Sequence, residues 1–130
     1  MANTHVVRHM KDVINREVEN CQGGEGSIFV RQILGYDVNL PISGFQGDSE
    51  AFHFIHITTL PKGSSVGEHH HIDNEEIYLV IKGVGEMVVD GDKYVMKPGS
   101  IGLVRNGAAH SMKNIGDEEL QMLVVEVELK

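Results

Sequence analysis

The sequence has no tryptophan, a single cysteine and no long apolar run, and the last two features each exclude a class of protein. One cysteine, Cys21, cannot form an intrachain disulfide, which is typical of proteins from a reducing compartment. No apolar run approaches the roughly 20 residues that cross a bilayer. The N-terminal segment carries charges from Arg8 to Glu19 and lacks the apolar core of a secretory signal. We therefore expect a cytoplasmic protein with no membrane partner.

Positive charge is also scarce. The chain has 11 Lys and Arg residues against 19 Asp and Glu residues, which gives a formal net charge of -8. A chain of this charge is repelled by a phosphate backbone, so we expect no nucleic-acid partner. Its 130 residues, 41% of them hydrophobic and 23% charged, predict one globular domain rather than a disordered chain.

Glycine, by contrast, is abundant, with 15 residues that separate short runs of Val, Ile and Leu. This pattern is typical of short strands joined by tight turns. The Asp90-Gly91 pair predicts a two-residue hairpin turn, because both central residues of a type I′ turn need positive φ. So many short strands predict an all-β sandwich or barrel. The predicted strands are 27–34, 51–60, 76–82, 84–89, 92–96, 101–104, 109–114 and 119–128.

The N-terminal part of the chain is open to two interpretations. Apolar residues in residues 1–22 recur at near-helical spacing, but the same segment could be an extended arm that ends in a turn. Residues 35–50 contain glycines and a proline and predict a loop. We expect one domain overall, with residues 1–50 as an N-terminal arm and first strand and residues 51–130 as the barrel.

A group of histidines and one glutamate predicts a metal site. Side chains alternate between the faces of a strand, so His69 and His71 share a face while His70 points away. Glu76 can turn inward from the next strand, and His110 follows a later turn on a strand expected alongside. A solvated histidine-rich turn or an affinity tag is the alternative, but the run is internal and has Glu76 at strand spacing. Three neutral imidazoles and a carboxylate suit divalent Mn, Fe, Ni, Co or Zn, with one or two coordination positions open.

Two stretches of this sequence resemble the two motifs of the cupin superfamily. From Gly63 to Gly83 the chain reads G-x5-H-x-H-x4-E-x6-G, and from Gly99 to Asn114 it reads G-x5-R-x-G-x2-H-x3-N, with Arg105 where the family usually has proline. The resemblance covers about residues 51–128. It implies a cupin-like double-stranded β-helix, or jelly-roll barrel, that holds one divalent metal ion, Mn or Fe before Ni, Co or Zn. The ligands that it implies are His69, His71, Glu76 and His110.

Four further residues are candidates for a catalytic role. Tyr78 shares a face with Glu76 and could reach the pocket. His53 and His56 are three residues apart, so we expect them on opposite faces of their strand, with one of them lining the barrel. Arg105 lies at a turn and could pair with an anionic substrate at the pocket mouth. Each also has a structural interpretation, as a core, wall or surface residue.

Two functions fit these features. A metal with open positions could bind and polarise a small carboxylate or oxo acid in a decarboxylase, oxygenase or isomerase. Alternatively, the metal could hold a small ligand in a binding module without turnover. The chain resembles small bacterial cupins of the oxalate-decarboxylase-like type, although Val66 stands where oxalate decarboxylases carry arginine. Cupins commonly pair, and the apolar run near Val6 predicts a homodimer.

Overall fold

The computed structural model describes residues 4–40 and 42–129, and most of its regular structure is β-strand. Residues 1–3, Pro41 and Lys130, which fall within the expected arm, loop and barrel, lie outside the described residues. No helix within the described ranges has the length and apolar character needed to cross a membrane. The elements are η1 Met10–Asp12, β1 Arg16–Glu19, η2 Cys21–Gly23, β2 Ser27–Gly35, β3 Phe52–Leu60, β4 Ser65–His70, β5 Asn74–Lys82, β6 Gly85–Val89, β7 Asp92–Met96, β8 Ile101–Val104, β9 Ala109–Asn114 and β10 Leu120–Glu128.

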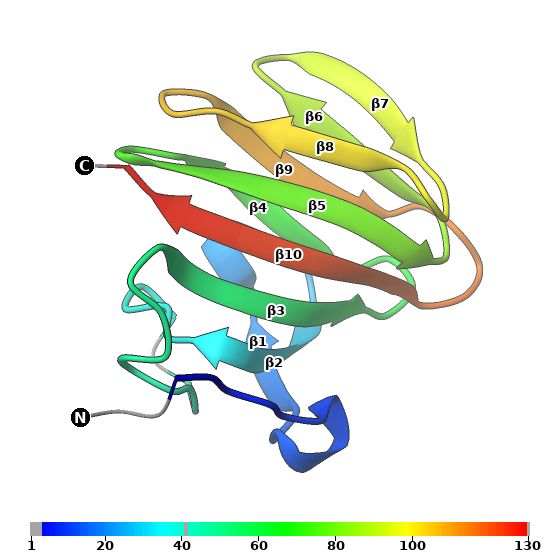
Figure 1. Cartoon of the computed structure of the whole chain (residues 1–130). Helices are drawn as coiled ribbons and strands as arrows, with labels where there is room; N and C mark the ends of the chain where they lie inside the picture. The colour runs from blue at the N-terminus through cyan, green and yellow to red at the C-terminus, as the bar shows by residue number, and fades with distance from the viewer. Residues whose placement is uncertain (1–3, 41, 130) are drawn as a thin grey trace.

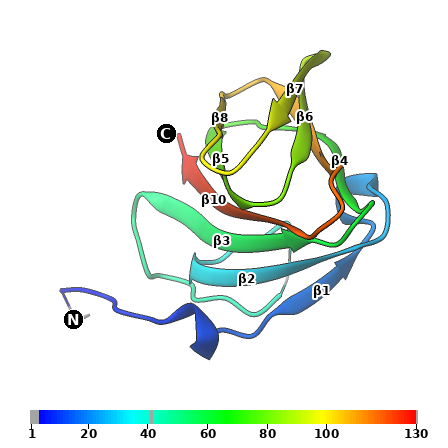
Figure 2. The ribbon, with the colours of Figure 1, turned by 90° about the vertical axis from the view of Figure 1, so that its right-hand side faces the viewer.

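The strands form two antiparallel sheets that curve around a common interior (Figure 1 and Figure 2). The larger sheet has the order β1-β2-β3-β10-β5-β8, and the smaller has the order β4-β9-β6-β7. Strands that are distant in sequence lie side by side, because β10 pairs with β3 on one edge and with β5 on the other. This arrangement confirms the predicted jelly-roll barrel. The eight predicted strands agree with the observed ones to within two residues at each end, and the structure adds β1 and β4.

The N-terminal segment is an arm, and the helical interpretation is wrong for its described residues. From residue 4 onward its only regular elements are the two 3-10 turns η1 and η2 and the short strand β1, which pairs with β2 at the edge of the larger sheet. The apolar spacing does not produce one buried face, because Val7 and Ile14 are exposed whereas Val13 is buried. Pairing with β2 satisfies the backbone of β1 instead.

The interior is built by side chains at alternate strand positions. In β10, Met122 and Val124 are buried, and in β5 Tyr78 and Val80 are buried, as a period of two requires. The same alternation continues beyond the apolar core and buries two acidic side chains. Glu76 of β5 and Glu126 of β10 are directly paired across the two strands.

The η2 turn lies against β4 at a separation that only glycine permits. A Cβ added at Gly67 would overlap the backbone of Gln22, and one added at Gly24 would overlap the backbone of Ser65. These contacts hold Gln22 over the strand that carries His69.

Replacing Gly67 with alanine should therefore destabilise the protein by about 1–3 kcal/mol, because the new methyl group meets backbone that must move. Thermal and denaturant unfolding of Gly67→Ala measure this change. Gly116→Ala is the matched control, since a Cβ there meets only ordinary contacts 3.6–3.7 Å away. Equal stability of the two variants would contradict the close packing of η2 on β4.

Candidate metal centre

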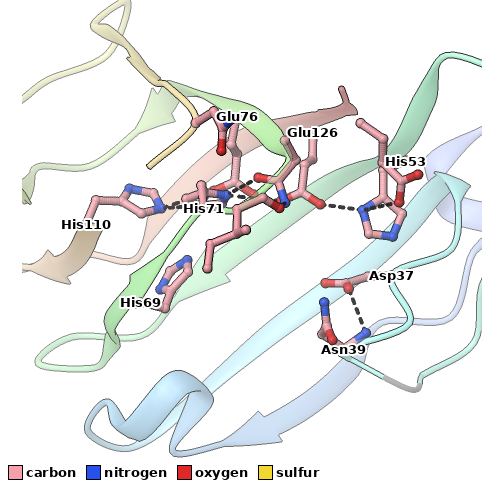
Figure 3. A network of polar contacts seen from close by, with 12 residues as sticks. Asp37, Asn39, His53, His69, His71, Glu76, His110 and Glu126 are labelled. Carbon is pink, nitrogen blue, oxygen red and sulfur yellow. Dashed lines mark hydrogen bonds and ion pairs between the residues drawn. The ribbon is translucent and has the colours of Figure 1, made fainter. Parts of the chain in front are cut away.

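The structure brings together the four residues predicted to hold a metal. One donor atom from each of His69, His71, Glu76 and His110 lies within 4.8 Å of the others, and we call these residues the His/Glu cluster (Figure 3). His69 is in β4, and His71 is the first residue after that strand. Glu76 is in β5 and His110 is in β9, so both sheets contribute. His69 and His110 are direct partners across β4 and β9. His70 is exposed, as the alternation of side chains predicts.

Three donor atoms of the cluster have the spacing of neighbouring ligands around one ion. The Nε2 atoms of His71 and His110 are 2.9 Å apart, and Oε1 of Glu76 lies 3.3 Å and 3.2 Å from them. Two ligands about 2.1 Å from an ion at right angles to each other are about 3.0 Å apart. Glu76 Oε1 is buried and accepts no hydrogen bond from any described residue, so a cation would satisfy it.

Hydrogen bonds outside the cluster set the tautomers of two of its rings. Nδ1 of His69 is 2.8 Å from the carbonyl oxygen of Gly67, and Nδ1 of His71 is 2.6 Å from Oδ1 of Asn74. Both oxygens can only accept, so both Nδ1 atoms donate. Each Nε2 is then the nitrogen that can offer a lone pair to a metal ion, because a hydrogen bond at Nδ1 fixes the orientation and the tautomer of the ring. The residues present therefore fit a divalent metal ion.

The charges in the cluster depend on burial and on close carboxylates. Burial opposes protonation of His71, but contacts with Glu126 and Glu76 outweigh it and raise the pKa of His71 to about 10. Burial alone would raise the pKa of Glu76, yet the His110 and His71 rings beside it hold that pKa well below its usual value. Burial lowers the pKa of His69. At neutral pH the free site thus holds an anionic Glu76, a neutral His69 and a proton on His71 that an entering cation must displace.

Glu126 is a part of this site that sequence reasoning missed. Its side chain is buried, its Oε1 lies 3.3 Å from Nδ1 of His71, and its Oε2 contacts Nδ1 of His53 (Figure 3). A signal for it was present, because Glu126 has the same parity as the buried Met122 and Val124 in its strand. A charged residue on a buried face needs a partner, and His71 and His53 provide it.

His53 and His56 do not lie on opposite faces, contrary to the expectation. A β-bulge sets Phe52 and Phe54 against consecutive residues of β10, so His53 is an extra residue whose ring turns toward Glu126. His56 faces the interior as well. Its ring stacks on that of Phe54 with 3.9 Å between the ring centroids, and its Nε2 lies 3.2 Å from Oε1 of Gln32. Alternation fails here because the bulge changes the side-chain parity of β3.

Two small cavities, of about 60 and 90 Å³, adjoin the cluster. His56 and Tyr78 line the first cavity, together with Cys21, whose pKa burial raises to about 11 so that it stays a thiol. Arg105 is exposed and is not one of the described residues that line the two cavities. The residues that line both cavities are Gln22, Asp37, Phe54, His69 and Glu76.

Comparison with known proteins agrees with this fold. The cupin domain family model matches residues 56–126. An oxalate-binding protein from Thermotoga maritima is 28% identical over 122 residues, which cover 94% of this chain and 93% of that protein. The crystal structure of a predicted oxalate decarboxylase from Thermotoga maritima is similar, with a TM-score of 0.83 and 26% identity over 95% of this chain and 100% of that one.

A more distant structure shares the fold alone. KdgF from Halomonas sp. superposes with a TM-score of 0.70 at 12% identity, over 99% of this chain and 96% of that one. The family model spans more than half of the 130 residues and includes all four residues of the His/Glu cluster. On this evidence the chain belongs to the cupin family.

Proposed function

We propose that this cupin binds a small carboxylate or oxo acid at a divalent metal ion held by His69, His71, Glu76 and His110. The observation that carries the proposal is the buried donor set, in which Glu76 Oε1 lies beside the Nε2 atoms of His71 and His110 and accepts no hydrogen bond from the described part of the chain. The name of the Thermotoga maritima oxalate-binding protein supports the ligand class.

Mixed imidazole and carboxylate donors favour Mn or Fe, and Ni, Co and Zn also suit this set. When bound, such an ion supplies a Lewis acid that polarises a carboxylate or carbonyl oxygen. The chain's own residues limit the size of the ligand, since cavities of about 60 and 90 Å³ leave room for only a small molecule.

Binding is better supported than oxalate decarboxylation. Val66 is buried and lines the smaller cavity, at the position where the family resemblance places an arginine in oxalate decarboxylases. His56 is also unsuited to act as an acid at neutral pH, because burial lowers its pKa to about 3. A decarboxylase, oxygenase or isomerase activity remains the second candidate, favoured by the acidic group Asp37 on the wall of both cavities.

Removing any one ligand should cost most of the bound metal, because the three remaining donors leave a gap in the coordination shell. His69→Ala, His71→Ala, Glu76→Ala and His110→Ala should each purify with far less metal than the wild type, as measured by elemental analysis after purification without added metal. His70→Ala is the control, since His70 is exposed on the other face. Metal loss in His70→Ala with retention in His69→Ala would contradict the assignment.

A small carboxylate should raise the melting temperature of the metal-loaded protein, because a ligand that binds only the folded state stabilises it. A thermal shift screen of small mono- and dicarboxylates tests this, and Glu76→Ala should show no shift. If no acid shifts the wild type, the site has no coordination position open to such ligands. Release of carbon dioxide from oxalate, abolished in His71→Ala, would instead establish the enzyme.

We also propose that the chain forms a homodimer through its N-terminal arm. Val7 is 91% exposed, Val6 is 44% exposed, and β1 occupies the edge of the larger sheet. Light scattering should give a dimer mass, and the double substitution of Val6 and Val7 by serine should lower it, whereas Val38→Ser, at an exposed loop position, should not. A monomer mass for the unmodified chain would refute this assembly.

A further inference from the structure

The described walls of the two cavities beside the His/Glu cluster carry acidic side chains but no lysine or arginine. Asp37 and Glu76 line both cavities, and Glu126 lines the larger. The described lining therefore offers an incoming anion no lysine or arginine, and the Asp37 carboxylate lines the same two cavities as the glutamate of the cluster.

Asp37 is held in this position by a buried side chain. Gln32 is fully buried; its Oε1 accepts a hydrogen bond from the backbone N–H of Asp37 at 2.7 Å, and its Nε2 donates to the carbonyl oxygens of Ile42 and Ser43. Oδ1 of Asp37 accepts a hydrogen bond from the backbone of Asn39 at 2.9 Å, as Figure 3 shows. The loop after β2 is thus pinned to the barrel wall, and Asp37 is a fixed acceptor rather than a freely moving surface acid.

Charge limits what can bind between Asp37 and the cluster. A divalent ion with the Glu76 carboxylate has a net charge of +1, which one ligand carboxylate neutralises. A second carboxylate, as in oxalate, would face Asp37 across a narrow cavity where like charges repel strongly. A hydroxyl group in that place would instead donate a charge-assisted hydrogen bond to Asp37.

Building on the proposed function, we propose that the preferred ligand is a monoanionic 2-hydroxy acid, and that Asp37 selects it by accepting a hydrogen bond from its hydroxyl group. Such an acid still offers two oxygens, one from the carboxylate and one from the hydroxyl, to adjacent open positions. Sites built to hydrogen-bond a hydroxyl group discriminate strongly against analogues that lack it, because the buried acceptor is then left unpaired. Asp37 is therefore a specificity-determining residue of the site.

Calorimetric titration of the metal-loaded full chain with glycolate, acetate and oxalate tests this inference. The wild type should bind glycolate roughly tenfold more tightly than acetate, since a hydrogen bond to a charged group is the difference between them. Asp37→Asn should lose that preference and bind oxalate more tightly than the wild type does, because the opposing charge is gone. Asparagine keeps the Oδ1 acceptor for the Asn39 backbone, so the loop should be preserved.

Asp92→Asn is the matched control, since it removes one exposed carboxylate in β7 and should leave all three affinities unchanged. Oxalate binding to the wild type at least as tight as glycolate binding, and unchanged in Asp37→Asn, would overturn the role of Asp37 while leaving the metal-dependent function intact. Failure of the metal-loaded wild type to bind any of the three acids would overturn both. The comparison of acids on the wild type decides the question even if Asp37→Asn does not fold.

Discussion

Two buried carboxylates on neighbouring strands, Glu76 and Glu126, repel each other, and the histidines around them offset that repulsion. Like charges directly opposite each other in a sheet destabilise it, and burial removes the water that would screen them. The structure places histidines between and beside them: His71 is 3.3 Å from both, His110 lies beside both His71 and Glu76, and His53 contacts the other carboxylate oxygen of Glu126. Each acid therefore contacts two histidines, and we call these five residues the charged row.

This row joins segments that backbone pairing alone does not bring together. His110 belongs to the smaller sheet, Glu76 and Glu126 to the larger, and His71 to the connection between the two. Three of its residues, His71, Glu76 and His110, also belong to the candidate metal site. In the free site, the proton on His71 offsets the negative charge of the two carboxylates. A bound cation would displace that proton and supply positive charge in its place.

Much of this could be predicted from the sequence, because the relevant signals are local. Alternation and turn chemistry located the strands and the Asp90-Gly91 hairpin, and the spacing of His69, His71 and Glu76 indicated the cluster. The structure also shows positive φ at both Asp90 and Gly91, as the turn requires.

What could not be predicted depends on irregular or long-range features. The bulge that turns His53 toward Glu126 interrupts the periodicity, and no single-sequence pattern marks its position. Asp37 lies in a loop, where no regular alternation indicates which way a side chain points. Its placement depends on the buried Gln32 on the preceding strand. Its role follows only from the cavities that the folded chain forms.

The position of β10 has a consequence for synthesis of the protein. This strand is the last in the sequence, yet it lies between β3 and β5 in the larger sheet. As the nascent chain leaves the ribosome, β3 and β5 have no shared partner until residues 120–128 emerge, and two strand edges stay open to misplaced pairing. The same strand brings Glu126 to His71. The barrel and the charged row are therefore both incomplete until residues 120–128 have folded into place between β3 and β5.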